Sequence, residues 1–135
     1  MKKTLITIVA AALALAGCIT VYPPDEAPAA SGAATAGFGQ TARAGRLRVI
    51  PLALLEDSRC PRAVSCVWAG QVRITARVAE GERTATRELT SGKPVAVGSG
   101  MLVLEAVAPS APVAGQKLAL SAYRFTFRRT ANIMR

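Results

Sequence analysis

Cysteine is the residue type in this 135-residue chain whose spacing points most directly to chemistry. Cys60 and Cys66 are separated by five residues, one of which is Pro61, and this spacing suits a short loop closed by a disulfide. A redox CxxC site has two intervening residues, and a zinc site needs three or four protein ligands. We therefore predict a structural disulfide between Cys60 and Cys66, with redox and metal-binding roles as the alternatives.

Histidine is absent from the chain, which excludes Ser-His-Asp and Cys-His catalysis. The sequence also contains no GxSxG elbow and no glycine-rich phosphate loop. A carboxylate-based hydrolase would need several acidic residues to converge, and their spread over predicted turns and wet strand faces is more typical of solvated surface. These residues are Glu56, Asp57, Glu80, Glu82, Glu88 and Glu105. We expect a protein that is not an enzyme and that uses no cofactor and no metal.

The N-terminus has the features of an export signal. Lys2 and Lys3 precede an uncharged apolar run from Leu5 to Ala16, which is shorter than the roughly 20 residues of a membrane-spanning helix. The run ends in Leu15-Ala16-Gly17-Cys18, which resembles the lipobox of bacterial lipoproteins. The resemblance implies cleavage before Cys18 and acyl chains on that residue, so the membrane would be reached through lipid. An ordinary secreted protein with an incidental cysteine is the alternative.

The lipobox resemblance also gives an expected address. Lipoproteins of enteric bacteria that stay in the inner membrane carry Asp directly after the lipidated cysteine, and Ile19 occupies that position here. The periplasmic face of the outer membrane is therefore the expected location. We expect three segments: a signal peptide over 1–17, a lipidated Cys18 with a disordered Pro-, Ala- and Gly-rich linker to residue 40, and a single domain over 41–135.

Hydrophobic alternation with a period of two residues predicts strands in that domain. The pattern is clearest over residues 71–78, and turn residues separate it from weaker candidates at 47–55, 84–89, 94–97, 101–107 and 118–128. No segment has a convincing helical stripe. The fold expected is all-β, a small antiparallel sandwich or barrel of six or seven strands. In the last candidate, Leu118 and Leu120 are out of phase with Tyr123, Phe125 and Phe127, which predicts a bulge, a kink or a change of sheet around residues 121–122. Burial of both faces of this strand is the alternative.

The segment Glu56–Gly70 carries a second resemblance. Its DSRCP, second cysteine and WAG resemble a motif of small bacterial lipoproteins and secreted proteins of uncharacterised function, which implies membership but no activity. Physically, Asp57 and Ser58 would cap backbone amides, Trp68 would pack as the main aromatic plug of the core, and Gly70 would adopt unusual backbone angles. The alternative is a binding loop, in which Glu56 and Asp57 hold a cation or Arg59 and Arg62 hold an anion.

The chain is basic, and loss of Lys2 and Lys3 with the signal would lower its formal net charge from +9 to +7. Export removes nucleic acid as a partner, so anionic envelope components are the expected counter-charge, with solubility as the alternative explanation. Four arginines alternate with apolar residues on two predicted strands and would form an anion-binding patch if those strands are neighbours: Arg73, Arg77, Arg124 and Arg128.

Together these features predict a lipid-anchored, non-catalytic binding or interaction module of the cell envelope. A structural envelope lipoprotein without a specific ligand, and an inhibitor of an exported hydrolase, are the alternatives.

Overall fold

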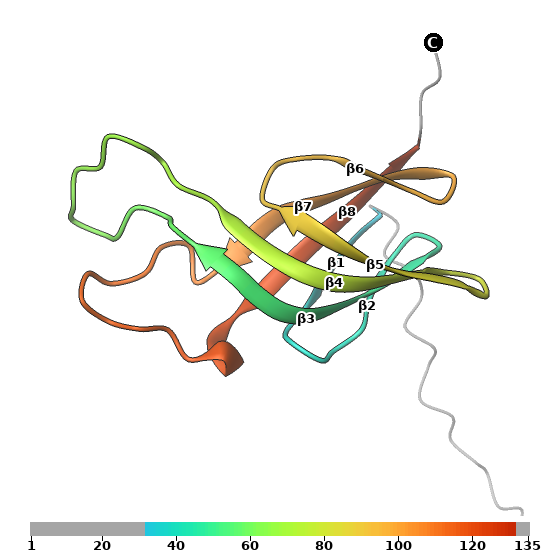
Figure 1. Cartoon of the computed structure of the whole chain (residues 1–135), viewed down its shortest axis with the longest axis horizontal. Coiled ribbons are helices and arrows are strands. Elements are labelled where there is room, and N and C mark those ends of the chain that lie inside the picture. The colour runs from blue at the N-terminus through green and yellow to red at the C-terminus, as the bar shows by residue number, and fades with distance from the viewer. Residues whose placement is uncertain (1–31, 132–135) are drawn as a thin grey trace, which may run out of the picture.

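The computed structural model describes residues 32–131 and is all-β, as predicted (Figure 1). It contains eight strands and one short 3-10 turn, η1. They are β1 (Ala33–Ala36), β2 (Ala42–Ala44), β3 (Leu47–Asp57), β4 (Val72–Glu80), β5 (Arg83–Thr90), β6 (Val95–Val97), β7 (Gly100–Ala108), η1 (Leu120–Ala122) and β8 (Arg124–Ala131). Within the described part of the chain, no helix is long and apolar enough to cross a membrane.

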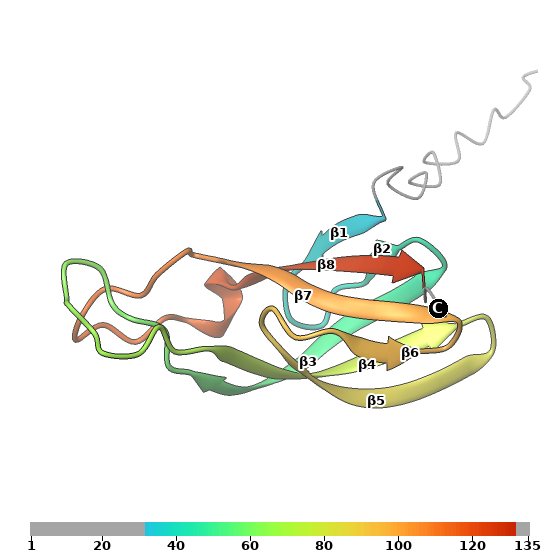
Figure 2. The same ribbon diagram turned by 90° about the horizontal axis from the view of Figure 1, so that it is seen from above.

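The strands form two antiparallel four-stranded sheets that pack face to face. Their orders are β1-β8-β7-β6 and β2-β3-β4-β5, and Figure 2 shows the two layers from the side. Of the two architectures expected from the sequence, the protein is therefore a sandwich. β1 and β2 are consecutive in the chain but belong to different sheets, so together they close one side of the sandwich.

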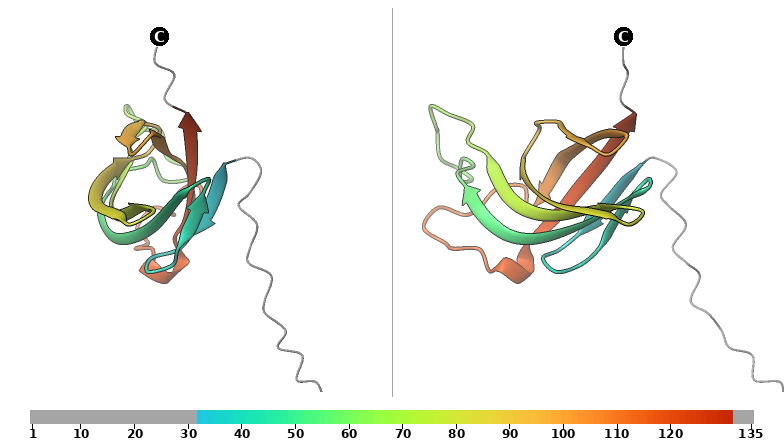
Figure 3. Two further views of the ribbon diagram at one scale, coloured as in Figure 1. Left: turned by 90° about the vertical axis from the view of Figure 1, so that its right-hand side faces the viewer. Right: turned by 45° about the vertical axis from the view of Figure 1, so that its right-hand side comes forward.

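The sandwich has two chemically different ends. At the entry end, where the described chain begins, the carbonyl of Gly32 accepts a hydrogen bond from the Arg129 amide, and the turns 45–46, 81–82 and 98–99 lie beside it. At the loop end lie the longer connections 58–71, 91–94 and 109–123. Figure 1 shows the longest connections on the left, and Figure 3 (left) shows the entry end facing the viewer.

The core lies between the inner faces of the sheets and is centred on the aromatic residues of β8. Phe125 and Phe127 are fully buried, and the rings of Tyr123 and Phe125 stack with their centroids 5.7 Å apart. Phe38 packs edge-on against Phe125 at 5.0 Å. The alternation predicted over residues 71–78 is confirmed, because Val72, Ile74, Ala76 and Val78 all face this core.

The domain begins before the predicted boundary at residue 41. β1 lies within the stretch predicted as linker, and Ala36 is buried against the core, as are Ala42 and Ala44 of β2. Alanine fits where the sheets approach closely, yet it carries little strand propensity, so the pattern did not reveal either strand. The predicted signal, Cys18 and the first part of the predicted linker lie outside the described residues.

The predicted irregularity before β8 is confirmed. Residues 120–122 form η1, after which the chain returns to an extended conformation at Tyr123. Leu118 packs partly against the core and Leu120 is exposed, while Tyr123, Phe125 and Phe127 face inward. The 3-10 turn thus absorbs the change of phase seen in the sequence.

Candidate functional site

The neck of the long loop 58–71 is built around a carboxylate with two cooperating partners. Asp57 is the last residue of β3, and its Oδ1 and Oδ2 accept hydrogen bonds of 2.8 and 2.9 Å from Nε and Nη2 of Arg59. The hydroxyl of Tyr123 donates to the same Oδ2 at 2.7 Å. Arg59 thus pairs with both oxygens of Asp57 at once. Tyr123 directly precedes β8, which belongs to the other sheet, so its hydrogen bond to Asp57 connects the neck of the loop to the core.

Electrostatics fix the protonation states in this cluster. Hydrogen bonds from Arg59 hold the pKa of Asp57 below its ordinary value despite burial, and the Tyr123 hydroxyl adds to the lowering. Burial raises the pKa of Tyr123 to about 12, with the hydrogen bond to Asp57 contributing. Asp57 is therefore a permanent anion at neutral pH with both oxygens occupied, a state suited to holding structure and unsuited to proton transfer.

Three hydrogen bonds close the loop at its base. The Ser58 amide donates to the Gln71 carbonyl at 2.9 Å, the Gln71 amide donates to Ser58 Oγ at 3.0 Å, and that hydroxyl donates back to the Gln71 carbonyl. Gly70 lies inside this neck with φ +69°, and a Cβ at that position would collide with the Ser58 carbonyl. The predicted unusual backbone at Gly70 is confirmed, and glycine is required there because a side chain would collide with the Ser58 carbonyl.

The disulfide predicted between Cys60 and Cys66 is confirmed, and its Cα atoms lie 5.9 Å apart. Beyond the neck, the Cys60 amide also donates to the Ala69 carbonyl. The loop is therefore held at two levels, once at its base and once at the disulfide, and only the segment around residues 61–68 is left to project.

The second long connection, 109–119, supports the first. Arg59 Nη1 donates to the carbonyls of Val107 and Pro109, and the Arg62 amide donates to the Pro112 carbonyl at 3.0 Å. Arg62 and Val113 form an isolated parallel bridge between the two loops. The two long loops therefore contact each other and form one structural unit at the loop end.

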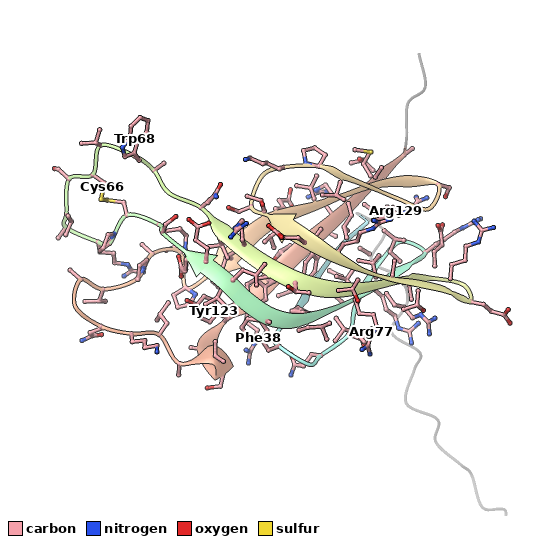
Figure 4. All side chains as sticks on the ribbon, viewed as in Figure 1. Phe38, Cys66, Trp68, Arg77, Tyr123 and Arg129 are labelled. Atoms are coloured by element: carbon pink, nitrogen blue, oxygen red, sulfur yellow. A yellow bond between two sulfur atoms is a disulfide. The ribbon has the colours of Figure 1, made fainter. Side chains whose placement is uncertain are left out.

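The tip of loop 58–71 is apolar and exposed, which corrects the role predicted for Trp68. Its side chain is 81% exposed and that of Val67 is 91% exposed, so Trp68 is not the plug of the core (Figure 4). The aromatic residues of β8 fill that role instead. Trp68 lies between Cys66 of the disulfide and Ala69, whose carbonyl accepts the Cys60 amide, so the backbone is held on both sides of it.

Two β-bulges add to the exposed apolar surface. In the pairing of β3 with β4, the register skips Leu52 and Leu55, and both side chains are partly exposed. In the described residues, every large apolar side chain left exposed lies in the loop-end connections or in the second half of β3. The set is Leu52, Leu55, Val64, Val67, Trp68, Val113 and Leu120. Such a concentration on one end of a small domain is typical of an interaction surface.

A groove of about 680 Å³ runs beside this surface between β3 and the second loop. Leu54, Leu118 and Leu120 line it with apolar atoms, and Asp57 and Tyr123 line it with polar ones. Lys117 is a further lining residue, and within residues 32–131 it makes no ion pair. The groove could receive an apolar side chain flanked by an acidic group.

The predicted arginine patch does not form. Arg73 and Arg77 lie on β4 of one sheet, whereas Arg124 and Arg128 lie on β8 of the other. Arg73 contacts Glu56 and Glu88 at 3.0 and 2.6 Å, and Arg128 contacts Glu105 at 2.8 Å. Arg124 donates to the backbone carbonyls of Ser121 and Tyr123. Sequence alternation gave the outward direction of these side chains but not which strands are neighbours.

The side chains proposed as the alternative ion-binding site of the loop are engaged with other protein groups. Asp57 and Arg59 satisfy each other, while Glu56 accepts hydrogen bonds from Gln71 and Arg73. Among residues 32–131, the Arg62 side chain donates only to the Ser110 hydroxyl, at 3.4 Å. Over residues 32–131 there is no group of three or more Cys, Asp or Glu side chains that could hold a metal ion.

Comparisons with protein-family models, with curated proteins and with solved structures find no match to this chain. The function must therefore be inferred from the geometry of the site itself.

Proposed function

We propose that this protein is a lipid-anchored envelope protein, located at the periplasmic face of the outer membrane, that binds another envelope protein through its loop end and catalyses no reaction. The observation that carries the proposal is the exposure of Val67 and Trp68, which directly follow the Cys60–Cys66 disulfide in the chain. Trp is among the residues that contribute most to binding at protein interfaces.

Rigidity is the second support. A loop ordered before binding loses little conformational entropy when the complex forms, so more of the contact energy appears as affinity. The neck hydrogen bonds, the disulfide and the contacts with loop 109–119 provide that order here. The surrounding exposed leucines and the groove beside Tyr123 supply further apolar area for a partner.

The position of the tip is the third support. The described chain enters the sandwich at Gly32, at the end opposite the loops, and the proposed lipid-bearing Cys18 lies fourteen residues earlier. An anchor at the entry end leaves the loop end free to face away from the membrane. A partner in the periplasm, including an exported hydrolase, could then reach it.

Site-specific photocrosslinking in intact cells tests the binding role. A photoreactive aromatic residue replaces Trp68 in the full-length chain, and the control places it at Thr86, an exposed residue on the middle of β5. We expect one protein adduct of defined mass from position 68 and none from position 86. Binding of the identified partner to the purified protein should weaken at least tenfold in Trp68→Ala, the size expected for an interface anchor.

Two results would contradict the binding role: the absence of an adduct from position 68, or the same adducts from positions 68 and 86. The first would favour a structural lipoprotein without a specific ligand. The anchor is tested separately by intact-mass analysis of the membrane fraction, which should find a mature N-terminus at Cys18 carrying acyl chains. Cys18→Ala should leave an uncleaved or mislocalised precursor, and an unmodified N-terminus elsewhere would refute the anchor.

A further inference from the structure

A cluster of arginines on the outer face of the β2-β3-β4-β5 sheet lies near the entry end. Arg43 on β2 and Arg48 on β3 are directly opposite each other in the strand register, and both are exposed. Arg46 lies in the turn that connects these strands. Arg48 is paired with Ala79 on β4, so Arg77, two residues before Ala79, projects from the same face beside it. We call these four arginines the basic face.

The basic face is not neutralised by acidic side chains. In the described part of the chain, Arg43, Arg46 and Arg77 make no ion pair, and Arg48 donates only to the Gly81 carbonyl, at 2.9 Å. The neighbours of Arg77 and Ala79 on β5 are the neutral residues Thr86 and Thr84. Like charges directly opposite across two strands destabilise a sheet, so an external anion would relieve repulsion that the fold leaves in place.

The basic face adjoins the point where the chain enters the domain. The Arg129 amide bonds the Gly32 carbonyl, and the Arg129 side chain lies against Gly45 in the turn next to Arg46. Figure 4 shows Arg77 and Arg129 on the half of the sandwich away from Trp68. The molecule is thus polarised, with exposed apolar residues at one end and unpaired arginines at the other.

We propose that the basic face binds the phosphates of anionic phospholipids in the leaflet that carries the lipid anchor. Gly32 lies fourteen residues after Cys18, and a chain of that length can span at most about 50 Å, so an anchored domain stays within reach of that surface. Tethering raises the local concentration of lipid phosphates at the basic face, so individually weak contacts are sufficient for binding. Docking through the basic face holds the entry end at the bilayer and directs the Trp68 tip away from it.

Vesicle binding by the mature chain made without lipid tests the basic face. The chain is sedimented with vesicles of phosphatidylglycerol and phosphatidylcholine, and with vesicles of phosphatidylcholine alone. We expect binding only to the anionic vesicles, and loss of that binding at ~0.5 M salt, where the Debye length is roughly 4 Å. Arg43→Gln/Arg77→Gln should lower the partition coefficient at least tenfold, because each arginine near an anionic surface contributes about a fivefold factor.

Arg87→Gln/Lys93→Gln is the matched control. It removes the same charge from two exposed residues outside the basic face, and Arg87 projects from the other face of the sheet because it pairs with the buried Ala76. We expect its partition coefficient to stay within about twofold of the parent. An equal loss of binding in the two double variants would show that only net charge matters and would overturn the proposal. Equal binding to neutral and anionic vesicles, or no binding to anionic vesicles, would also overturn it.

A second measurement tests the orientation in the lipidated protein. Trp68 is the only tryptophan of the chain, so its fluorescence reports the loop end alone. Brominated phospholipids in anionic vesicles should leave its emission unquenched, and strong quenching would show that the loop end enters the bilayer instead. The orientation rests on the proposed anchor, but the vesicle assay omits the lipid. Failure of anchoring at Cys18 and failure of the basic face are therefore distinguished.

Discussion

The hydroxyl of Tyr123 and the carboxylate of Asp57 are joined by a 2.7 Å hydrogen bond across 66 residues of sequence. Tyr123 continues the aromatic row of β8, and Asp57 ends β3, so this bond connects the core to the neck of the exposed loop. Arg59 adds two side-chain N–H donors to this carboxylate, and its backbone amide also donates to Oδ1, at 3.4 Å. Asp57 is therefore the point at which the core aromatic row and the neck of the loop share one anion.

Removing the Tyr123 hydroxyl should destabilise the fold without opening the core. Tyr123→Phe leaves the ring in place and deletes a hydrogen bond to a charged group, which should lower the free energy of unfolding by about 1.5 to 3 kcal/mol. Asp57→Asn should cost more, because it leaves Arg59 without its counter-charge. Urea unfolding of both single variants and the double variant measures the coupling. Strict additivity would show that the bond does not contribute.

The same cluster predicts two pH windows. The pKa of Asp57 is lowered in the folded state, so its contribution is present above the unfolded value near 4 and is lost as pH falls through the folded value. The pKa of Tyr123 is raised to about 12, so its contribution is present below about pH 10 and is lost as pH rises towards 12. Thermal melts should show the acid loss reduced in Asp57→Asn and the alkaline loss reduced in Tyr123→Phe. Parallel profiles for parent and variants would contradict this.

Reduction of the disulfide should lower stability while leaving the sandwich folded. The chain-entropy model gives about 2 to 3 kcal/mol for a ring of this size, and the bond lies outside the core. The Cys60→Ser/Cys66→Ser variant should match the reduced protein in urea midpoint and in far-UV circular dichroism. An unchanged midpoint after reduction would mean that the loop is held by its neck alone.

Gly70 should tolerate substitution much less well than Gly81, although both have positive φ. Alanine at either position incurs the left-handed backbone cost of about 1 to 2 kcal/mol. At Gly70 the new Cβ also meets the Ser58 carbonyl, whereas at Gly81 nothing lies within 4 Å. Chemical unfolding should therefore show a clearly larger loss for Gly70→Ala. Equal losses would indicate that the neck shifts without strain.

The fluorescence of Trp68 should indicate a solvent-exposed indole in the protein without a partner. Its emission should resemble that of a free indole and be quenched readily by acrylamide, because the side chain is largely exposed. Trp68→Ala should change the free energy of unfolding by less than about 0.5 kcal/mol, whereas Phe125→Ala should cost about 3 to 5 kcal/mol. A large loss in Trp68→Ala would return the residue to the core role expected from the sequence.

Local patterns predicted much of the fold because they depend on neighbours in the chain. The alternation of β4, the break before Tyr123 and the Cys60–Cys66 spacing each follow from contacts or phases within a few residues. The same rule failed in β3. Strict alternation from Val49 places Leu55 inward, but the two bulges turn it outward and bring Leu54 inward instead.

The candidate site depended on long-range placement, which alternation does not encode. Nothing near Asp57 in the sequence indicates Tyr123 as its partner, and the large apolar side chain of Trp68 argues for burial unless the neck is known. The arginine patch failed for the same reason, since sheet membership decides it. A nearer signal existed for the basic face: Arg43, Arg46 and Arg48 fall within six residues around Gly45.

The eleven residues of β3 make nine pairs with the nine residues of β4, and the surplus is Leu52 and Leu55. A bulged residue has no partner on the neighbouring strand, so a chain without these two residues would retain all nine pairs between β3 and β4. The two unpaired leucines thus add apolar surface to β3 while Asp57 keeps its pairing with Val72. New contact area can thus arise in this fold through changes in strand length, with the core composition left as it was.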